Sequence, residues 1–583
     1  MKLILRFLKP HWKLFVITIL LIILDVAGAL YIPTLVAEMM NEGTSKSTLN
    51  DLLATGGQIV IASIISGVGA ILGGYTCSLL SSKIGKDLRD AIYEKSLKLS
   101  MYDFKQFGTA SITTRTISDI TNIQFAFMSF IQMVLPVPAI FIISCTLSFR
   151  LDVVVGFMLI AVLIIVMLVA FCIMRIASPV FRRLQKLLDR MSTVLIENIT
   201  GVRVVRAFNK QASEQKRLDI AFTDYANTSI KANRMFANLD GLSFFSINVF
   251  VVLIYWFSGG RIAAGYFQLG DITALIEYAL LALFYLMMAQ MVILTLPRAL
   301  ECCHRVQDVL DHSPEIIDLV SEDKDINLEN DDEVLKFNNV YFRFSDAEED
   351  TLSNLNFTCR RGETTAIIGG TGSGKSTVAS LILRFHDVTE GTVYLNNKDI
   401  RQMKQHSLRE HISYIQQKAW LFSGTIAENL CYGKPNATDS ELKHALEIAQ
   451  ASDFVNSLPE GIGAYVAQGG VNFSGGQRQR LSIARALVKK PELYIFDDSF
   501  SALDFKTDAS LRKALESETK DSAVLIIAQR VSTIRNANQI VVLNEGKMVG
   551  LGTHEELMES CKVYKEIVNS QTKEVKEVWK KIE

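Results

Sequence analysis

Apolar residues gather in the first half of the chain in runs long enough to cross a membrane. A bilayer-spanning helix needs about 20 predominantly apolar residues. The runs predict six such helices, over residues 14–34, 57–79, 127–149, 152–174, 241–263 and 273–296. The first run is too long for a signal-peptide core and lacks a small-residue cleavage site, so we interpret it as a span. The pattern predicts a six-helix transmembrane domain over residues 1–315.

Two long polar segments, residues 81–125 and 175–240, interrupt these runs and are rich in Lys and Arg. The turns on the other side are short and poor in both. By the positive-inside rule, both termini and both basic segments are cytoplasmic. The amphipathic order of the basic segments favours helices that continue into the cytoplasm over solvated loops. We therefore expect a multi-pass protein of the plasma membrane.

The pattern changes after about residue 311. The segment SEDKDINLENDDE is acidic and poor in apolar residues, which is typical of a linker. Short apolar runs separated by polar turns follow and predict the strands of a soluble α/β domain. We expect the acidic linker, the α/β domain and a charged C-terminal tail to occupy residues 316–333, 334–570 and 571–583.

Composition narrows the possible classes of protein further. The chain has 583 residues, of which 49% are hydrophobic, and its mean hydropathy is +0.25. These values fit a membrane portion joined to a soluble one, and six spans are more than a simple anchor requires. The net charge of −1 argues against a nucleic-acid partner. The adjacent Cys302 and Cys303 lack metal-ligand spacing, so we interpret them as buried thiols.

The soluble domain contains a glycine-rich turn with the pattern of a phosphate-binding loop. The letters GGTGSGKST satisfy GxxxxGK[ST] between a predicted strand and a predicted helix, the context of a phosphate-binding loop. Backbone N–H groups and the helix N-terminus surround the phosphates, Lys375 reaches the β- and γ-phosphates, and Ser376 binds Mg²⁺. The candidate ATP ligands here are Gly370, Thr371, Gly372, Ser373, Gly374, Lys375, Ser376 and Thr377.

Three further residues complete the expected nucleotide site. Asp497 ends the apolar run LYIF, where a carboxylate can hold Mg²⁺ through a water. Gln417 is a candidate ligand of Mg²⁺ or of water and a sensor at the domain junction. Phe344 is placed to stack on adenine, although a core phenylalanine fits the sequence equally well.

Two acidic residues, Asp25 and Glu277, fall inside predicted spans. An intramembrane carboxylate is costly and usually faces a cavity or a partner. Each could contact a cationic substrate or relay a proton, or could simply be satisfied by a structural pair.

The segment Phe473-Ser474-Gly475-Gly476-Gln477 resembles LSGGQ, the signature of ATP-binding cassette (ABC) transporters. With Lys375, Gln417, Asp497 and the loop ending at Asp504 in family order, the chain resembles exporter-type ABC transporters over nearly its whole length. It specifically resembles the degenerate half of a heterodimeric bacterial multidrug exporter.

This resemblance implies that two nucleotide domains pack head to tail. Ser474, Gly475, Gly476 and Gln477 would then face ATP held by the partner, and Asp504 would reach across the interface. The resemblance also implies coupling turns around residues 104–114 and 201–211.

Three departures from the family pattern stand out: one is the segment VAQGG, where Gly-Glu-Arg-Gly is usual, and the other two lie at the expected hydrolytic centre. Asp498 stands where the family has the glutamate that polarises water, and Gln529 stands in place of a histidine. The departures predict a site that binds ATP and Mg²⁺ but hydrolyses slowly or not at all. We expect a partner half-transporter that brings the glutamate and the histidine, and export of small apolar, amphipathic or cationic compounds. A lipid or peptide exporter and an ATP-gated channel-like protein are the alternatives.

Overall fold

The computed structural model describes residues 2–44, 49–263, 268–318 and 332–571. They form two compact units. The first comprises the chain up to residue 97 and residues 108–312, and the second comprises residues 98–107 and the chain from residue 313 onward. The short segment 98–107 therefore packs with the second unit, although its sequence lies between helices of the first. Most of the expected linker, residues 319–331, and of the expected tail, residues 572–583, lies outside the described residues.

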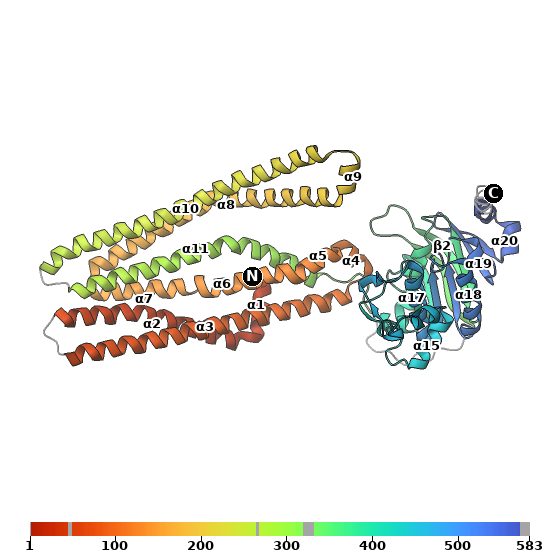
Figure 1. Ribbon diagram of the computed structural model, residues 1–583, viewed down its shortest axis with the longest axis horizontal. Helices are drawn as coiled ribbons and strands as arrows, with labels where there is room; N and C mark the ends of the chain where they lie inside the picture. The colour runs from red at the N-terminus through yellow and green to blue at the C-terminus, as the bar shows by residue number, and fades with distance from the viewer. Residues whose placement is uncertain (1, 45–48, 264–267, 319–331, 572–583) are drawn as a thin grey trace. The chain divides into compact units, whose positions relative to one another are not determined.

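The first unit consists of helices, drawn side by side in Figure 1. They are α1 (Lys2–Leu8), α2 (Trp12–Thr44), α3 (Leu49–Lys98), α5 (Thr109–Thr114), α6 (Ile120–Ser129), α7 (Pro136–Leu151), α8 (Val153–Thr200), α9 (Val202–Ala207), α10 (Gln211–Ala263) and α11 (Leu269–Asp311). One-turn π-helices, Arg115–Asp119 and Phe130–Val134, join α5 to α6 and α6 to α7.

Each of the six predicted spans lies within this helical set, except that the fourth begins one residue early, at Asp152. The Asp152 carboxylate instead caps α8, because it accepts the N–H groups of Val154 and Val155 at 2.7 and 3.1 Å. Among the described residues, four stretches are long and apolar enough to cross a membrane: Lys2–Gly43, Leu49–Lys98, Thr109–Leu151 and Leu269–Asp311. Val153–Leu168 and Gly241–Phe257 are shorter apolar helical stretches.

Close contacts between helices hold the first unit together. A Cβ at Gly28 on α2 would meet the Ser66 Cβ on α3 at 2.8 Å, so the absence of a side chain lets these helices approach. Thr34 on α2 and Tyr278 on α11 share a hydroxyl hydrogen bond of 2.6 Å. Helices α8 and α10 run alongside each other (Figure 1).

A buried carboxylate joins the π-helical turn before α6 to the C-terminal part of α11. Asp119 is 2% exposed and accepts from Arg305 Nε and Nη2 at 2.9 and 2.6 Å. The Cys302 thiol donates to the same carboxylate at 3.5 Å. Cys302 and Cys303 are buried free thiols, which confirms their interpretation from the sequence.

The second unit is built on a ten-stranded sheet with the order β5-β4-β1-β2-β12-β11-β3-β10-β9-β6. The strands β11, β3, β10, β9 and β6 are parallel, and β5, β4, β1 and β2 form an antiparallel wing. The bounds are β1 (Glu333–Phe342), β2 (Leu352–Arg360), β3 (Thr364–Gly369), β4 (Glu390–Leu395), β5 (Lys398–Asp399), β6 (Ile412–Ile415), β9 (Leu493–Asp497), β10 (Ala523–Ile527), β11 (Gln539–Asn544) and β12 (Lys547–Gly552). A separate pair consists of β7 (Gly424–Thr425) and β8 (Tyr465–Val466).

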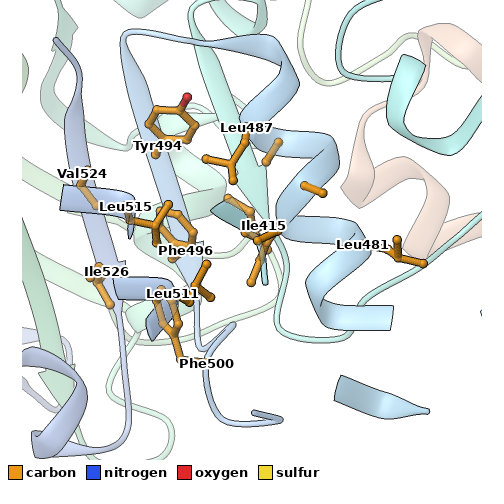
Figure 2. Packing of buried hydrophobic residues seen from close by; sticks show 14 of the residues in the cluster. Ile415, Leu481, Leu487, Tyr494, Phe496, Phe500, Leu511, Leu515, Val524 and Ile526 are labelled. Atoms are coloured by element: carbon orange, nitrogen blue, oxygen red, sulfur yellow. The ribbon is translucent and has the colours of Figure 1, made fainter. Parts of the chain in front are cut away.

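Helices complete the second unit, and several of them pack on the parallel strands. They are α12 (Lys375–Ile382), α13 (Gln405–Glu410), α14 (Ile426–Cys431), α15 (Asp439–Ile448), α16 (Ser452–Asn456), α17 (Gly475–Lys489), α18 (Phe505–Glu518), α19 (Val531–Ile534), α20 (His554–Ser560) and a terminal helix over residues 562–571. Every residue of β9 and β10 is buried, as expected for strands covered on both faces. Figure 2 shows side chains of β9, α17 and α18 in one of the two large cores.

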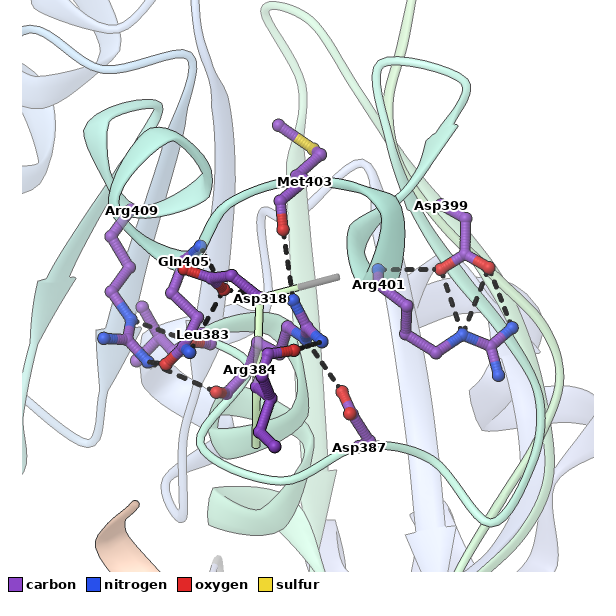
Figure 3. A network of polar contacts seen from close by, with 10 residues as sticks. Asp318, Leu383, Arg384, Asp387, Asp399, Arg401, Met403, Gln405 and Arg409 are labelled. Carbon is purple, nitrogen blue, oxygen red and sulfur yellow. Dashed lines mark hydrogen bonds and ion pairs between the residues drawn. The ribbon is translucent and has the colours of Figure 1, made fainter. Parts of the chain in front are cut away.

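A buried arginine ties the start of the linker to the second unit (Figure 3). Arg384 is 1% exposed and donates to Asp387 Oδ1 at 2.9 Å, to the Met403 carbonyl at 3.1 Å and to the Ile317 carbonyl at 3.3 Å. Asp318 accepts from the backbone N–H of Gln405 at 3.1 Å. A buried guanidinium needs such partners, so the chain enters the second unit along a fixed path up to residue 318.

Candidate functional site

Parallel strands place the candidate residues at one edge of the sheet. The carboxyl ends of β3, β10, β9 and β6 lie next to one another, in that order. These ends lead into the glycine-rich turn, Gln529, Asp497 with Asp498, and Gln417, respectively. Ligands of such sheets bind outside the carboxyl ends of the strands. The topology therefore brings together groups that are more than 150 residues apart in sequence.

The glycine-rich turn joins β3 to α12 through left-handed backbone. Gly372 and Gly374 have φ angles of 81° and 90°, which residues other than glycine rarely adopt. A Cβ at Gly374 would also meet the Leu352 side chain at 2.5 Å. The turn thus depends on glycine to present its N–H groups and the start of α12 to an anion.

Lys375 begins α12 and is 9% exposed. Its Nζ donates to the Gly369 and Gly370 carbonyls at 3.0 and 2.6 Å. Burial lowers the pKa of the Lys375 ammonium, and the nearby Asp498 and Asp497 carboxylates oppose that shift. The ammonium is held within the turn, where it can meet phosphate oxygens.

Asp497, at the end of β9, offers carboxylate oxygens beside the Ser376 hydroxyl. Ser376 Oγ lies 3.4 Å from Asp497 Oδ1, and Tyr414 OH donates to Asp497 Oδ2 at 3.0 Å. Burial raises the pKa of the Asp497 carboxyl, and the bonds from Tyr414 and Ser376 oppose this. Hard oxygen ligands of this kind fit Mg²⁺, so Ser376 and Asp497 are the residues that would hold it. Tyr414 was not predicted, because in the sequence it is one more aromatic residue of a short apolar run.

Asp498 has a left-handed backbone, with φ 47°, fixed by its N–H donating to the Ile527 carbonyl at 2.7 Å. Gln417 Nε2 donates to Asp498 Oδ2 at 3.1 Å. Burial raises the pKa of Asp498, with the Gln417 bond and the Arg530 charge opposing. Gln417 therefore meets Asp498 directly, while Gln529 follows two residues after Ile527, the backbone partner of Asp498.

Phe344 lies two residues beyond β1 and is half-buried. Its ring meets Phe342 edge to face at 4.8 Å and His386 at 5.3 Å. His386 in turn meets the ring of Tyr102 at 6.5 Å, and Ser345 Oγ donates to Tyr102 OH at 2.6 Å. Tyr102 belongs to α4 (Met101–Phe107), the segment that packs with the second unit. Phe344 is thus linked through His386 to a segment that lies between membrane helices in sequence.

Residues 473–477, called the Ser474 turn below, form a capping box at the start of α17. Ser474 Oγ accepts from the Gln477 N–H at 3.2 Å, and Gln477 Oε1 accepts from the Ser474 N–H at 2.9 Å. Gly475 and Gly476 follow the cap, and a Cβ at Gly475 would meet nothing within 4 Å. Phe473 is 8% exposed and belongs to the core. The structure therefore uses the Gln477 side chain locally, while Ser474 keeps a hydroxyl hydrogen to donate.

Asp504 is the N-cap of α18. Its two oxygens accept from the N–H and the hydroxyl of Thr507 at 2.9 and 2.8 Å. These bonds lower the pKa of Asp504 and keep it ionised at an exposed position. The predicted reach across an interface would start from this capped conformation.

The two intramembrane acids have different surroundings. Asp25 on α2 is half-buried, and its Oδ1 accepts from the Ser66 hydroxyl on α3 at 2.9 Å. Glu277 on α11 is exposed. Ser66 is thus a structural partner for Asp25, one of the two alternatives that the sequence allowed. Glu277 is exposed on the surface of the helical unit.

Fold and site together define a membrane protein with a P-loop nucleotide-binding domain. The chain matches the family model of the ABC transporter transmembrane region over residues 15–287 and that of the ABC transporter over residues 352–501. An uncharacterized ABC transporter ATP-binding protein of Mycobacterium tuberculosis is 34% identical, over 97% of both chains. The chain therefore belongs to the ABC transporter family, as an exporter-type half with fused membrane and ATP-binding domains.

Two further relatives refine this assignment. An ATP-dependent lipid A-core flippase of Syntrophus aciditrophicus is 30% identical over 89% of this chain and 85% of its own. The solved structure of a bacterial Atm1-family ABC exporter with ATP bound has a TM-score of 0.80 and 24% identity, covering 96% of this chain and 98% of its own. The structural similarity confirms the predicted fold, a helical membrane domain followed by a P-loop ABC domain.

Proposed function

We propose that this chain is one half of a heterodimeric ATP-driven exporter and that its own nucleotide site binds ATP but hydrolyses it slowly. The observation that carries the proposal is the length and the hydrogen bonding of the Asp498 side chain. Its carboxylate is one methylene shorter than that of a glutamate, and it already accepts a hydrogen bond from Gln417. A misplacement of about 1 Å can cost on the order of a hundredfold in rate.

The remaining groups of the site suit binding. The turn from Gly370 to Thr377 would surround the ATP phosphates, Ser376 and Asp497 would hold Mg²⁺, and Phe344 would pack on adenine. Gln529 can form hydrogen bonds but cannot become a cation near the γ-phosphate. The site would thus retain Mg²⁺ and ATP without efficiently activating water.

The Ser474 turn would serve the partner's ATP instead. Ser474, Gly475 and Gly476 present a hydroxyl, glycine backbone and a helix N-terminus, which favour a γ-phosphate. The partner half would bring the glutamate and the histidine that this chain lacks. ATP binding would close the two nucleotide domains and open the membrane cavity outward, and hydrolysis at the competent site would reset it.

We infer that the nucleotide domain lies on the cytoplasmic side of the plasma membrane, and the many Lys and Arg residues of the two basic segments support this orientation. Small apolar or amphipathic compounds are the substrate class we favour, with Asp25 and Glu277 as candidate contacts for cationic ones.

ATPase measurements on the purified chain in lipid nanodiscs, alone and with its partner half, test the proposal. We expect slow hydrolysis by the chain alone and substrate-stimulated hydrolysis by the pair. Nucleotide-occupancy measurements should find ATP retained at this chain's site through several turnovers. Hydrolysis by the chain alone at the rate of the pair would refute the proposal.

Lipid translocation is the second candidate, because a relative that matches most of the chain is named a lipid A-core flippase. Proteoliposomes that contain the pair separate the two. Accumulation of a cationic dye in inverted vesicles supports drug-type export, whereas ATP-dependent movement of a fluorescent lipid without dye accumulation supports flipping.

A further inference from the structure

Gln571, in the terminal helix over residues 562–571, holds the loop that carries Gln529. Its side-chain Nε2 donates to the Gln529 carbonyl at 2.7 Å, and its Oε1 accepts from the Val531 N–H at 2.8 Å. One amide thus pairs with two backbone groups on either side of Arg530. A primary amide offers both a donor and an acceptor, which this arrangement requires.

The loop lacks a cap of its own. Gln529 and Arg530 are exposed, and α19 begins at Val531 and has four residues. Arg530 is the N-cap residue of α19, but its side chain makes no capping bond. The first N–H groups of a helix need an acceptor from outside the helix. Gln571, forty residues later, supplies that acceptor.

The terminal helix is itself firmly placed. Tyr564 is fully buried, and its OH lies 2.7 Å from His554 Nδ1. Ile567 and Val568 pack against the same core. Residues spaced three, four and seven along a helix share one face, so Gln571 follows Tyr564, Ile567 and Val568 toward the body of the domain.

Beyond the loop, the contacts continue to the nucleotide site. The Asp498 N–H donates to the carbonyl of Ile527, two residues before Gln529, at 2.7 Å, and the Asp498 carboxylate accepts from Gln417 at 3.1 Å. We propose that Gln571 is a positioning residue: it holds the loop that follows Ile527, the residue to which the Asp498 backbone is bonded, so that the terminal helix controls how long this site retains ATP. This inference rests on the nucleotide-site roles of Asp498 and Gln529 given under the proposed function.

The test uses the full chain in lipid nanodiscs with Mg²⁺ and a fluorescent ATP analogue. Gln571→Ala removes both bonds, and Gln571→Glu keeps the acceptor for Val531 but removes the donor to Gln529. We expect faster amide hydrogen exchange at Val531 in the alanine variant. Release of the analogue should accelerate by roughly two- to tenfold in both variants, the range for losing about one neutral hydrogen bond.

Ser570→Ala is the matched control, because the Ser570 hydroxyl bonds only within its own helix, to the Ile567 carbonyl at 2.9 Å. It should leave both readouts as in the parent chain. Unchanged release from both Gln571 variants, with or without faster exchange at Val531, would overturn the inference. Fast hydrolysis by the parent chain would refute the proposed function instead. The two failures can be told apart, because nucleotide release and amide exchange are measured on this chain alone, without the partner half.

Discussion

The Ser474 turn and the Asp498 region lie within about 25 residues of each other, but they are built differently. The Ser474 turn closes its hydrogen bonds within four residues, through the box with Gln477. Asp498 instead depends on Gln417 and on a loop that is held by Gln571. Local bonds make the first a self-contained turn, which we propose faces a partner. The second is a network whose geometry depends on residues far apart in sequence, and it contains the residue proposed to slow hydrolysis, Asp498.

The largest expected effect comes from restoring the altered network. Asp498→Glu combined with Gln529→His should raise hydrolysis by the chain alone about a hundredfold, because the longer carboxylate reaches the attacking water. The glutamate must adopt the left-handed backbone of Asp498, at a folding cost of about 1–2 kcal/mol at most. A hundredfold in rate corresponds to about 2.7 kcal/mol of barrier. The steady-state ATPase rate in nanodiscs measures the gain.

Adding Lys375→Ala to the double variant provides the control. Loss of the phosphate-binding ammonium should remove the gain, which assigns the new hydrolysis to this chain's own site. A double variant as slow as the parent chain would show that these two residues are not what limits the site.

The next largest effect is expected on the activity of the pair and not on the stability of this chain. Gly475→Ala adds a Cβ that meets nothing within 4 Å in this chain, so the melting temperature should not fall. The same Cβ would block close approach to the partner's γ-phosphate. We expect the ATPase rate of the pair to drop about tenfold or more, equivalent to about 1.4 kcal/mol per tenfold.

Gly463→Ala is the matched control, since its Cβ would only touch Glu460 at 4.0 Å. It should change neither the melting temperature nor the ATPase rate. If Gly475→Ala left the rate of the pair intact, the Ser474 turn would not contact the partner's nucleotide.

The same contrast explains what could be predicted from the sequence. The membrane runs, the strand before the glycine-rich turn and the turn itself depend on neighbouring residues, and the structure confirms them as elements. Tyr414 and Gln571 escaped prediction, because their roles arise when distant elements pack together. Asp25 is similar: its bond to Ser66 depends on how α2 and α3 are rotated, which periodicity does not fix.

The smallest expected effect tests how self-contained the Ser474 turn is. Ser474→Ala removes one arm of the capping box, and the loss of such a cap costs about 1 kcal/mol of folding stability. Thr553→Ala removes the same arm of the box between Thr553 and Glu556 at the start of α20. Equal drops in melting temperature, with only Ser474→Ala slowing the ATPase of the pair, would show that the Ser474 hydroxyl acts on the partner's nucleotide as well as on its own helix. Equal ATPase rates in both variants would reduce Ser474 to a cap.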